Sequence, residues 1–187
     1  FAESNVTVSG ATWIECAGPN AHTTASAELS PVIEPDGTLA LLTTGDAADA
    51  DVPDGTDPNS LDASETLSAE LRGAFDVSIL RLDVVVPPGA QCLAFDVAFA
   101  TEEFPEYTIG GEQQSTNLWN DGFLAELDTN DWVVSGSTIV APNNFAFDAD
   151  GNYISVKSPL FAAGTAVTDT GMVYDGSTPR LRAQTPL

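Results

Sequence analysis

Acidic and amide side chains gather in the middle of the sequence, at the end of a strand-like segment. Glu102 and Glu103 follow the alternating apolar residues of 93–99, and Asn120 and Asp121 precede a second apolar run. Calcium binds about six to eight hard oxygen atoms and accepts carboxylates and amide carbonyls from loops. The sequence therefore predicts a Ca²⁺ site in which Glu102 or Glu103 joins Asn120 and Asp121, completed by Asp46, Asp76 or backbone carbonyls.

Glu102 and Glu103 are adjacent in the sequence, which makes it difficult for both to bind the same ion. Neighbouring side chains on an extended backbone point to opposite faces, so only one glutamate easily faces a given ion. Pro105 ends the strand and would fix the turn that follows. A second interpretation stays open, in which Glu102 and Glu103 accept hydrogen bonds from loop amides and 120–122 is simply a turn.

Asp46 is the best placed of the acids in an Asp-, Gly- and Pro-rich segment, 45–60, because it follows the short apolar strand predicted at 39–43. The other acids of that segment are irregularly spaced between prolines, which indicates a solvated loop. A similar run at 148–152, Asp-Ala-Asp-Gly-Asn, lacks the later ligands of an EF-hand. We expect a hairpin turn there, because Asp-Gly between Phe147 and Tyr153 is a strong hairpin signal.

A catalytic alternative rests on paired carboxylates. Jelly-roll folds can host glycosidases, and Glu103 with Glu126 or Asp121 could lie across a groove. The sequence contains no G-x-S-x-G elbow, phosphate-binding loop or zinc-ligand spacing. The single histidine, His22, lies in a segment of loop composition, 16–24, where a solvated side chain is expected. We therefore expect a protein that is not an enzyme.

The elements that must position these residues are mostly strands. Leu80, Leu82, Val84 and Val86 alternate with polar residues, a turn is predicted at 87–89, and the alternation returns over 92–100. Further short strands are predicted at 5–13, broken near Gly10, and at 123–127, 132–134, 137–140, 144–147 and 153–156. This pattern predicts an all-β protein, an antiparallel β-sandwich or jelly roll.

Helix is predicted only once, over 62–72. Asp62 and Glu65 resemble a capping box, and Gly73 could end the helix, so the fold should contain at most one or two short helices. The last segment, 165–187, shows at most one strand, near 171–174. With 187 residues, of which 43% are hydrophobic, the chain should form one folded domain over 1–187.

The charge balance excludes several classes of partner. A net charge of −23, from 28 acids against 5 Lys and Arg, argues against nucleic acid and anionic membranes, both of which require a basic surface. Cations are the natural counter-charge. The acid excess also has a plain explanation, since halophilic proteins carry solvated acids without local function.

The beginning of the sequence and its cysteines point to an oxidising compartment. The chain starts at Phe1 without a leader-like segment and contains no apolar run long enough to span a membrane, so we expect a mature secreted segment. Cys16 and Cys92 allow one disulfide, which the extracellular interpretation favours; two unpaired thiols are the alternative.

Several longer patterns carry a resemblance to a known family. Thr101 to Tyr107, Trp119 to Asp128, and 143–148 with 151–152 resemble the choice-of-anchor L domain family of bacterial surface proteins, and 42–47 and 173–179 extend the likeness. The resemblance implies an extracellular, cell-surface location and no catalytic activity. We therefore expect a role in adhesion or surface architecture, with a surface glycan or a protein as ligand.

One departure from the family pattern concerns the C-terminal part. Members of the family continue beyond the segment resembling 178–186 into further strands, whereas this sequence stops at Leu187. We therefore expect the last strands of the family to be missing here. A sheet edge left open in this way could exchange strands with another chain or segment.

Overall fold

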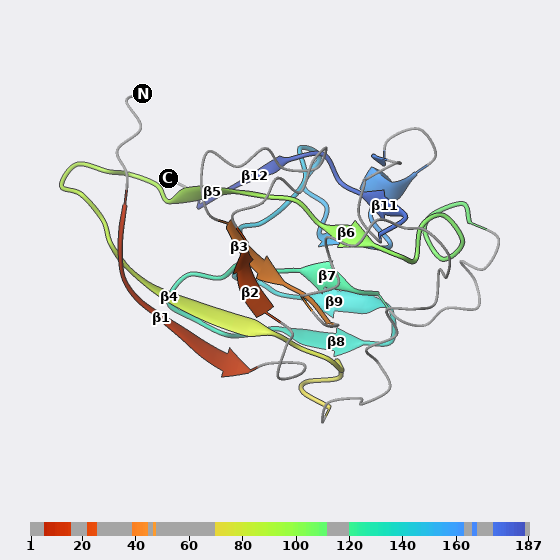
Figure 1. Cartoon of the computed structure of the whole chain (residues 1–187), viewed down its shortest axis with the longest axis horizontal. Coiled ribbons are helices and arrows are strands. Elements are labelled where there is room, and N and C mark those ends of the chain that lie inside the picture. Colours follow the sequence, from red (N-terminus) through yellow and green to blue (C-terminus); the bar gives the residue numbers. More distant parts are fainter. Residues whose placement is uncertain are drawn as a thin grey trace.

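Short antiparallel strands make up nearly all of the regular structure (Figure 1). The computed structural model describes residues 6–15, 22–25, 39–44, 47, 70–111, 120–162, 166–167 and 174–185. Within them the strands are β1 (Thr7–Glu15), β2 (His22–Ala25), β3 (Leu39–Leu42), β4 (Ile79–Val85), β5 (Ala94–Val97), β6 (Ala100–Thr101), β7 (Gly122–Phe123), β8 (Val133–Ser135), β9 (Thr138–Val140), β10 (Ile154–Ser155), β11 (Gly176–Ser177) and β12 (Leu181–Gln184). The all-β prediction is confirmed.

The described strands pair two by two, and every pairing is antiparallel: β1 with β4, β2 with β3, β5 with β12, β6 with β11, β7 with β10, and β8 with β9. Figure 1 shows β5, β12, β6 and β11 in one layer and β1, β4, β7, β8 and β9 in a second layer facing it. Two packed layers are the arrangement of a β-sandwich.

The longest pairing joins β1 to β4. Its register places Trp13 opposite Leu80 and Ala11 opposite Leu82, with irregularities between Val8 and Gly10 and between Trp13 and Glu15. A bulge inserts an extra residue without ending a strand. The predicted break near Gly10 is therefore wrong, because β1 runs through it.

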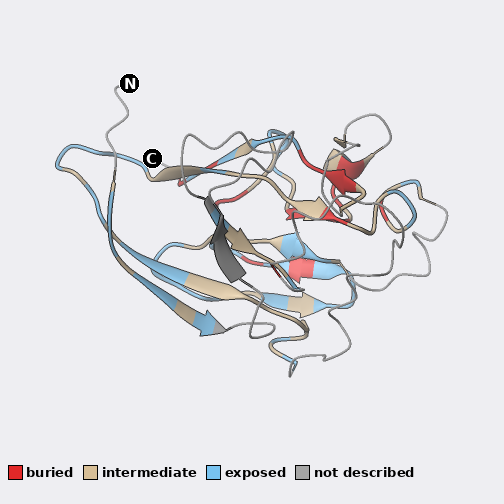
Figure 2. Cartoon of the chain, viewed as in Figure 1, coloured by how far each residue is buried: buried red, intermediate tan, exposed pale blue. Residues whose placement is uncertain are grey.

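The core lies between the two layers (Figure 2). Ile154 and Ala146 are fully buried, and the ring of Phe95 meets Phe123 and Phe145 edge to face, with centroids 6.1 and 5.8 Å apart. Aromatic rings prefer this geometry, because the positive edge of one ring meets the negative face of the other. The apolar faces of β5, β7 and β10 are thereby held together.

Several predicted elements need correction. His22 and Thr23 belong to strand β2, paired with β3, and not to a loop. The predicted turn at 87–89 exists, with Gly89 at φ 86° and Ala90 N donating to Pro87 O at 3.1 Å. The strands on its two sides nevertheless lie in different sheets, because β4 pairs with β1 and β5 pairs with β12.

Helix appears in the described residues mainly as one short 3-10 turn, η3 (Pro159–Phe161), whose first turn is capped by Ser158. The predicted helix over 62–72 lies largely outside the described residues; its last two residues, Leu71 and Arg72, enter a turn in which Leu71 and Ala74 exchange two backbone hydrogen bonds. Similarly, most of the strand predicted at 171–174 lies outside them, while β11 and β12 follow it.

The hairpin predicted at 148–152 is formed. Asp148 Oδ1 accepts hydrogen bonds from the backbone N–H of Asp150 and of Asn152, at 2.9 and 2.8 Å, and Phe147 pairs with Tyr153. An aspartate that bonds its own backbone two residues on is a turn former. Asp148 therefore acts in the turn.

Candidate functional site

The acidic turn after β6 is held by hydrogen bonds among its own backbone groups and threonine hydroxyls. Glu103 N donates to Thr101 Oγ1 at 3.1 Å, Tyr107 N donates to Glu103 O at 3.0 Å, and Thr108 Oγ1 donates to Pro105 O at 2.9 Å. Glu102 Oε1 and Glu103 Oε2 are both buried. The turn thus positions two glutamates firmly, with part of each carboxylate shielded from water.

Asp121 lies at the start of β7, beside Asp76. Much of the Asp121 residue remains exposed, yet its carboxyl is surrounded by enough protein that burial raises its pKa above the usual 3.8, and the nearby charge of Asp76 raises it further. Like charges that share a site disfavour ionisation of one another. The charges of two of the predicted ligands therefore interact in the folded protein.

The segment that carries Asp76 is joined to two other parts of the chain. Asp76 adopts a left-handed backbone conformation, with φ 53°. Two residues later, Ser78 Oγ donates to Thr43 O at 3.2 Å, and Thr43 Oγ1 lies 3.4 Å from Tyr174 Oη in a hydrogen bond. The end of β3 and the residue before Asp175 therefore meet beside the Asp76 segment.

Asp175 is an acid that the sequence interpretation did not select as a ligand. It directly precedes β11, whose Gly176 pairs with Thr101, so Asp175 and the glutamate turn leave the same end of this two-stranded sheet. The signal in the sequence was its place within the segment 173–179. We use the name acidic rim for Asp76, Glu102, Glu103, Asp121 and Asp175.

Asn120, a predicted ligand, uses its amide to join the turn between β8 and β9 to the turn that follows β10. Asn120 Nδ2 donates to Ser137 O at 2.9 Å, and Asn120 Oδ1 accepts from Lys157 N at 3.0 Å. Asp121 O also accepts a hydrogen bond, from Val156 N at 2.9 Å. These bonds fix the backbone from which the Asp121 side chain extends.

The acidic rim does not by itself form a complete metal cage. Among the described residues, no group of three or more His, Cys, Asp and Glu side chains is close enough to hold one metal ion. Asp46, the remaining predicted ligand, lies outside the described residues, although Thr43, three positions before it, reaches Ser78. The described chain supplies the carboxylate pair Asp76–Asp121.

The carboxylates of the predicted glycosidase alternative have different surroundings. Glu126 pairs through its backbone with Asn144, and Glu126 Oε2 accepts a hydrogen bond from Asp131 N at 2.8 Å. Glu103 belongs to the turn after β6, and Asp121 lies beside Asp76. A catalytic pairing among the three stays a prediction.

The predicted Cys16–Cys92 disulfide is not supported. Cys92 is a free and exposed thiol in the structure, and Cys16 lies outside the described residues.

Comparisons with known proteins give no relative. No protein-family model matches the chain, no curated protein matches it, and no solved structure matches it. The likeness to the choice-of-anchor L family therefore stays a prediction from its motifs. In the described part of the chain, no helix combines the length and the apolar character that a membrane crossing requires.

Proposed function

We propose that this protein is a non-catalytic extracellular module of a bacterial surface, which binds calcium at the acidic rim and serves in adhesion or surface architecture. The observation that carries the calcium part is the Asp76–Asp121 pair. Two carboxylates beside each other, in a chain of net charge −23, repel unless a cation lies between or near them. Calcium suits such a site because it accepts carboxylate and carbonyl oxygens in flexible arrangements.

The proposed role in surface architecture rests on the chain segments that meet beside Asp76. The hydrogen bonds of Thr43 with Ser78 and with Tyr174 link the end of β3, the segment before β4 and the segment before β11. An ion bound to Asp76 and Asp121 would add β7 to this group. Calcium would therefore stiffen the contact between the strands of the two layers.

The proposed extracellular location rests on the calcium affinity expected of such a site. A site with few charged ligands binds calcium weakly, with a Kd of about 10⁻⁴ to 10⁻³ M in extracellular modules. Such a site fills only where calcium is in the millimolar range, outside the cell. The acid excess and the resemblance to surface proteins support the same compartment.

Calorimetric titration of CaCl₂ into chelator-treated protein tests the proposal. We expect heat of binding and an increase in Tm, both reduced by Asp76→Asn and by Asp121→Asn. Asp150→Asn is the matched control, because Asp150 is exposed in the 148–152 hairpin and carries the same charge. Absence of heat and of any Tm shift at millimolar calcium would refute the calcium site.

A further inference from the structure

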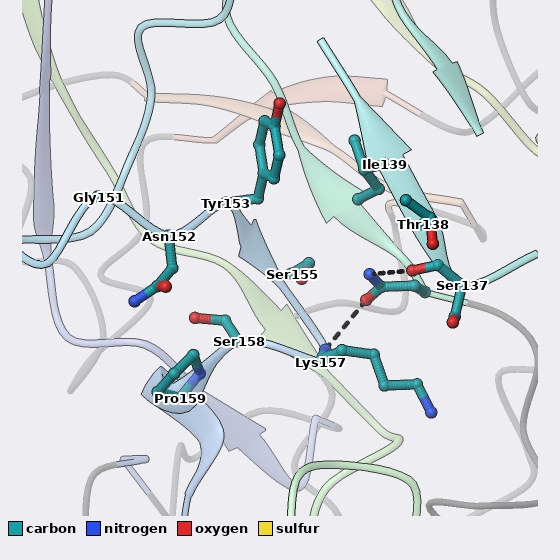
Figure 3. A pocket seen from close by; sticks show the side chains of 11 residues that line it. Ser137, Thr138, Ile139, Gly151, Asn152, Tyr153, Ser155, Lys157, Ser158 and Pro159 are labelled. Carbon is teal, nitrogen blue, oxygen red and sulfur yellow. Dashed lines mark hydrogen bonds between the residues drawn. The ribbon is translucent and has the colours of Figure 1, made fainter. Parts of the chain in front are cut away.

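An open pocket of about 380 Å³ lies beside β9 and β10, next to Asn120. Small-molecule pockets usually have volumes of about 300 to 1,000 Å³, so this one has room for a sugar unit. Figure 3 shows Asn152 and Ser158 on one side and Thr138 on the other, with Ser155 between them. Ser155 is only 3% exposed and forms the base.

The charge of this pocket differs from that of the rest of the molecule. Among the described residues that line it there is no Asp or Glu, although the chain contains 28 of them, and the one charged residue in that set is Lys157, the single lysine of the sequence. Lys157 Nζ donates to Tyr107 O at 3.4 Å, so its ammonium group is engaged with a backbone carbonyl of the protein. The pocket therefore offers neither an acidic cage for a cation nor an uncommitted cation for an anion.

The lining groups keep hydrogen-bonding capacity for a ligand. Ser158 Oγ accepts from Leu160 N at 3.3 Å, which leaves its O–H to donate. Asn152 Nδ2 donates to Asp148 Oδ2 at 2.9 Å, which leaves its Oδ1 to accept. The hydroxyls of Ser137 and Thr138 lie on exposed residues. Groups that can donate and groups that can accept a hydrogen bond are thus both present in the lining of the pocket.

Apolar surface accompanies these polar groups. Tyr153 Oη is engaged with Ala141, lying 3.1 Å from its N and 3.4 Å from its O, so Tyr153 offers its ring more than its hydroxyl. Ile139 and Pro159 also line the pocket, and Figure 3 shows Ile139 on the same side as Thr138 and Pro159 at the opposite end. Sugars have the matching character, with hydroxyl groups at their edges and C–H groups on their faces.

The walls are fixed before any ligand arrives. The two hydrogen bonds of Asn120, drawn dashed in Figure 3, join Ser137 on one wall to Lys157 on the other. A preformed site binds more tightly because less conformational entropy is lost.

We propose that this pocket binds an uncharged saccharide. The inference gives a ligand class to the adhesion role proposed above and rests on that role. An uncharged ligand is favoured because the net charge of −23 repels acidic glycans, whereas basic ligands would be drawn to the acids elsewhere.

Saturation-transfer difference NMR with the methyl glycosides of glucose, galactose, mannose and N-acetylglucosamine, and with glucuronate, tests the proposal. We expect transfer to at least one neutral glycoside at millimolar concentration, and weaker transfer to glucuronate. The double variant Ser137→Ala/Thr138→Val removes two exposed hydroxyls with little change of volume. Each lost hydrogen bond should weaken binding about 2- to 10-fold.

Thr129→Val is the matched control, because Thr129 is exposed and does not line the pocket, and circular dichroism checks that each variant is folded. Three results would overturn the proposal: no transfer to any neutral glycoside, a preference for glucuronate, or equal binding by the double variant and the control. Saccharide binding should persist in EDTA, since no carboxylate stands among the described residues that line the pocket. Failure here with calcium binding intact, or the reverse, separates the two proposals.

Discussion

Asp121 lies beside Asp76, and burial, followed by the charge of Asp76, raises the pKa of the Asp121 carboxyl. The folded protein therefore holds a proton on this group more readily than the unfolded chain does. Ionised Asp121 opposes folding above its folded-state pKa, and protonation relieves that penalty as the pH falls through that value. The pair is a source of instability that a bound cation can reverse.

The first prediction concerns pH in the absence of calcium. Asp121→Asn should raise the Tm at neutral pH in EDTA, because the ionised carboxylate and its repulsion by Asp76 are removed. The difference from the wild type should shrink as the pH approaches 3.8, where the carboxyl of the unfolded chain also protonates. Thermal melts from pH 3.5 to 7.5 measure it. A difference that is constant with pH would contradict the assigned cause.

Calcium should reverse the order of stability of the wild type and the Asp121→Asn variant. In millimolar CaCl₂ the wild type should gain stability by binding, by an amount that grows with the logarithm of the calcium concentration above Kd. Asp121→Asn and Asp76→Asn should gain little, so both should become less stable than the wild type. Magnesium at the same concentration should act more weakly, because it demands stricter geometry. Equal responses from wild type and variants would contradict the assignment.

Asn120→Ala should destabilise the chain by about 1 to 3 kcal/mol, because a bridge between Ser137 and Lys157 is lost and their backbone groups lose a partner. Asn120→Asp keeps an acceptor for Lys157 N but loses the donor to Ser137 O, so it should fall between wild type and alanine. Urea denaturation measures both. Asn143→Ala, at an exposed position, is the control and should change stability little.

Gly73 and Gly89 allow the cost of a left-handed backbone conformation to be distinguished from the cost of a steric clash. Gly73 and Gly89 have φ values of 83° and 86°, but a Cβ at Gly73 would lie 1.9 Å from Val134 O, whereas a Cβ at Gly89 has no heavy atom within 4 Å. Gly89→Ala should cost about 1 to 2 kcal/mol, the price of a left-handed residue with a side chain. Gly73→Ala should cost clearly more by urea denaturation. Equal losses of stability in the two variants would show that Val134 O moves away from the new Cβ at little cost, and would contradict this prediction.

Cys92 should be alkylated by iodoacetamide in the folded, unreduced protein, because its thiol is free and exposed. Mass spectrometry of the peptide that contains Cys92 measures the modification. Protection of Cys92 until a reductant is added would instead establish the predicted bond with Cys16.

Short-range patterns predicted the strands but not their partners. The alternation of Leu80, Leu82 and Val84 marked β4, and the Asp-Gly signal marked the hairpin at 148–152, because both depend on neighbouring residues. The pairing of β5 with β12 could not be predicted, since nothing in the alternation of one strand selects a partner far along the chain. The turn at 87–89 even favoured the wrong partner.

The sequence also predicted only part of the candidate site. Carboxylate chemistry selected Asp76 and Asp121 as calcium ligands, which stays a prediction, and in the structure the charge of Asp76 acts on the carboxyl of Asp121 and raises its pKa. Asn120 was predicted as a ligand from its side-chain oxygen, but that oxygen accepts from Lys157 N, a contact between distant segments that composition does not reveal. The saccharide pocket was missed because it carries no motif and is formed by small polar residues from separate segments.

The pairing of β1 with β4, β5 with β12 and β6 with β11 also has a consequence for biogenesis. Among the described strands, β1 gains its partner only once β4 has been synthesised, and β5 and β6 gain theirs only with β12 and β11. Chains dominated by distant pairings fold slowly. A nascent chain of this kind should therefore expose unpaired strand edges for much of its synthesis, and such edges are sites where chains can associate.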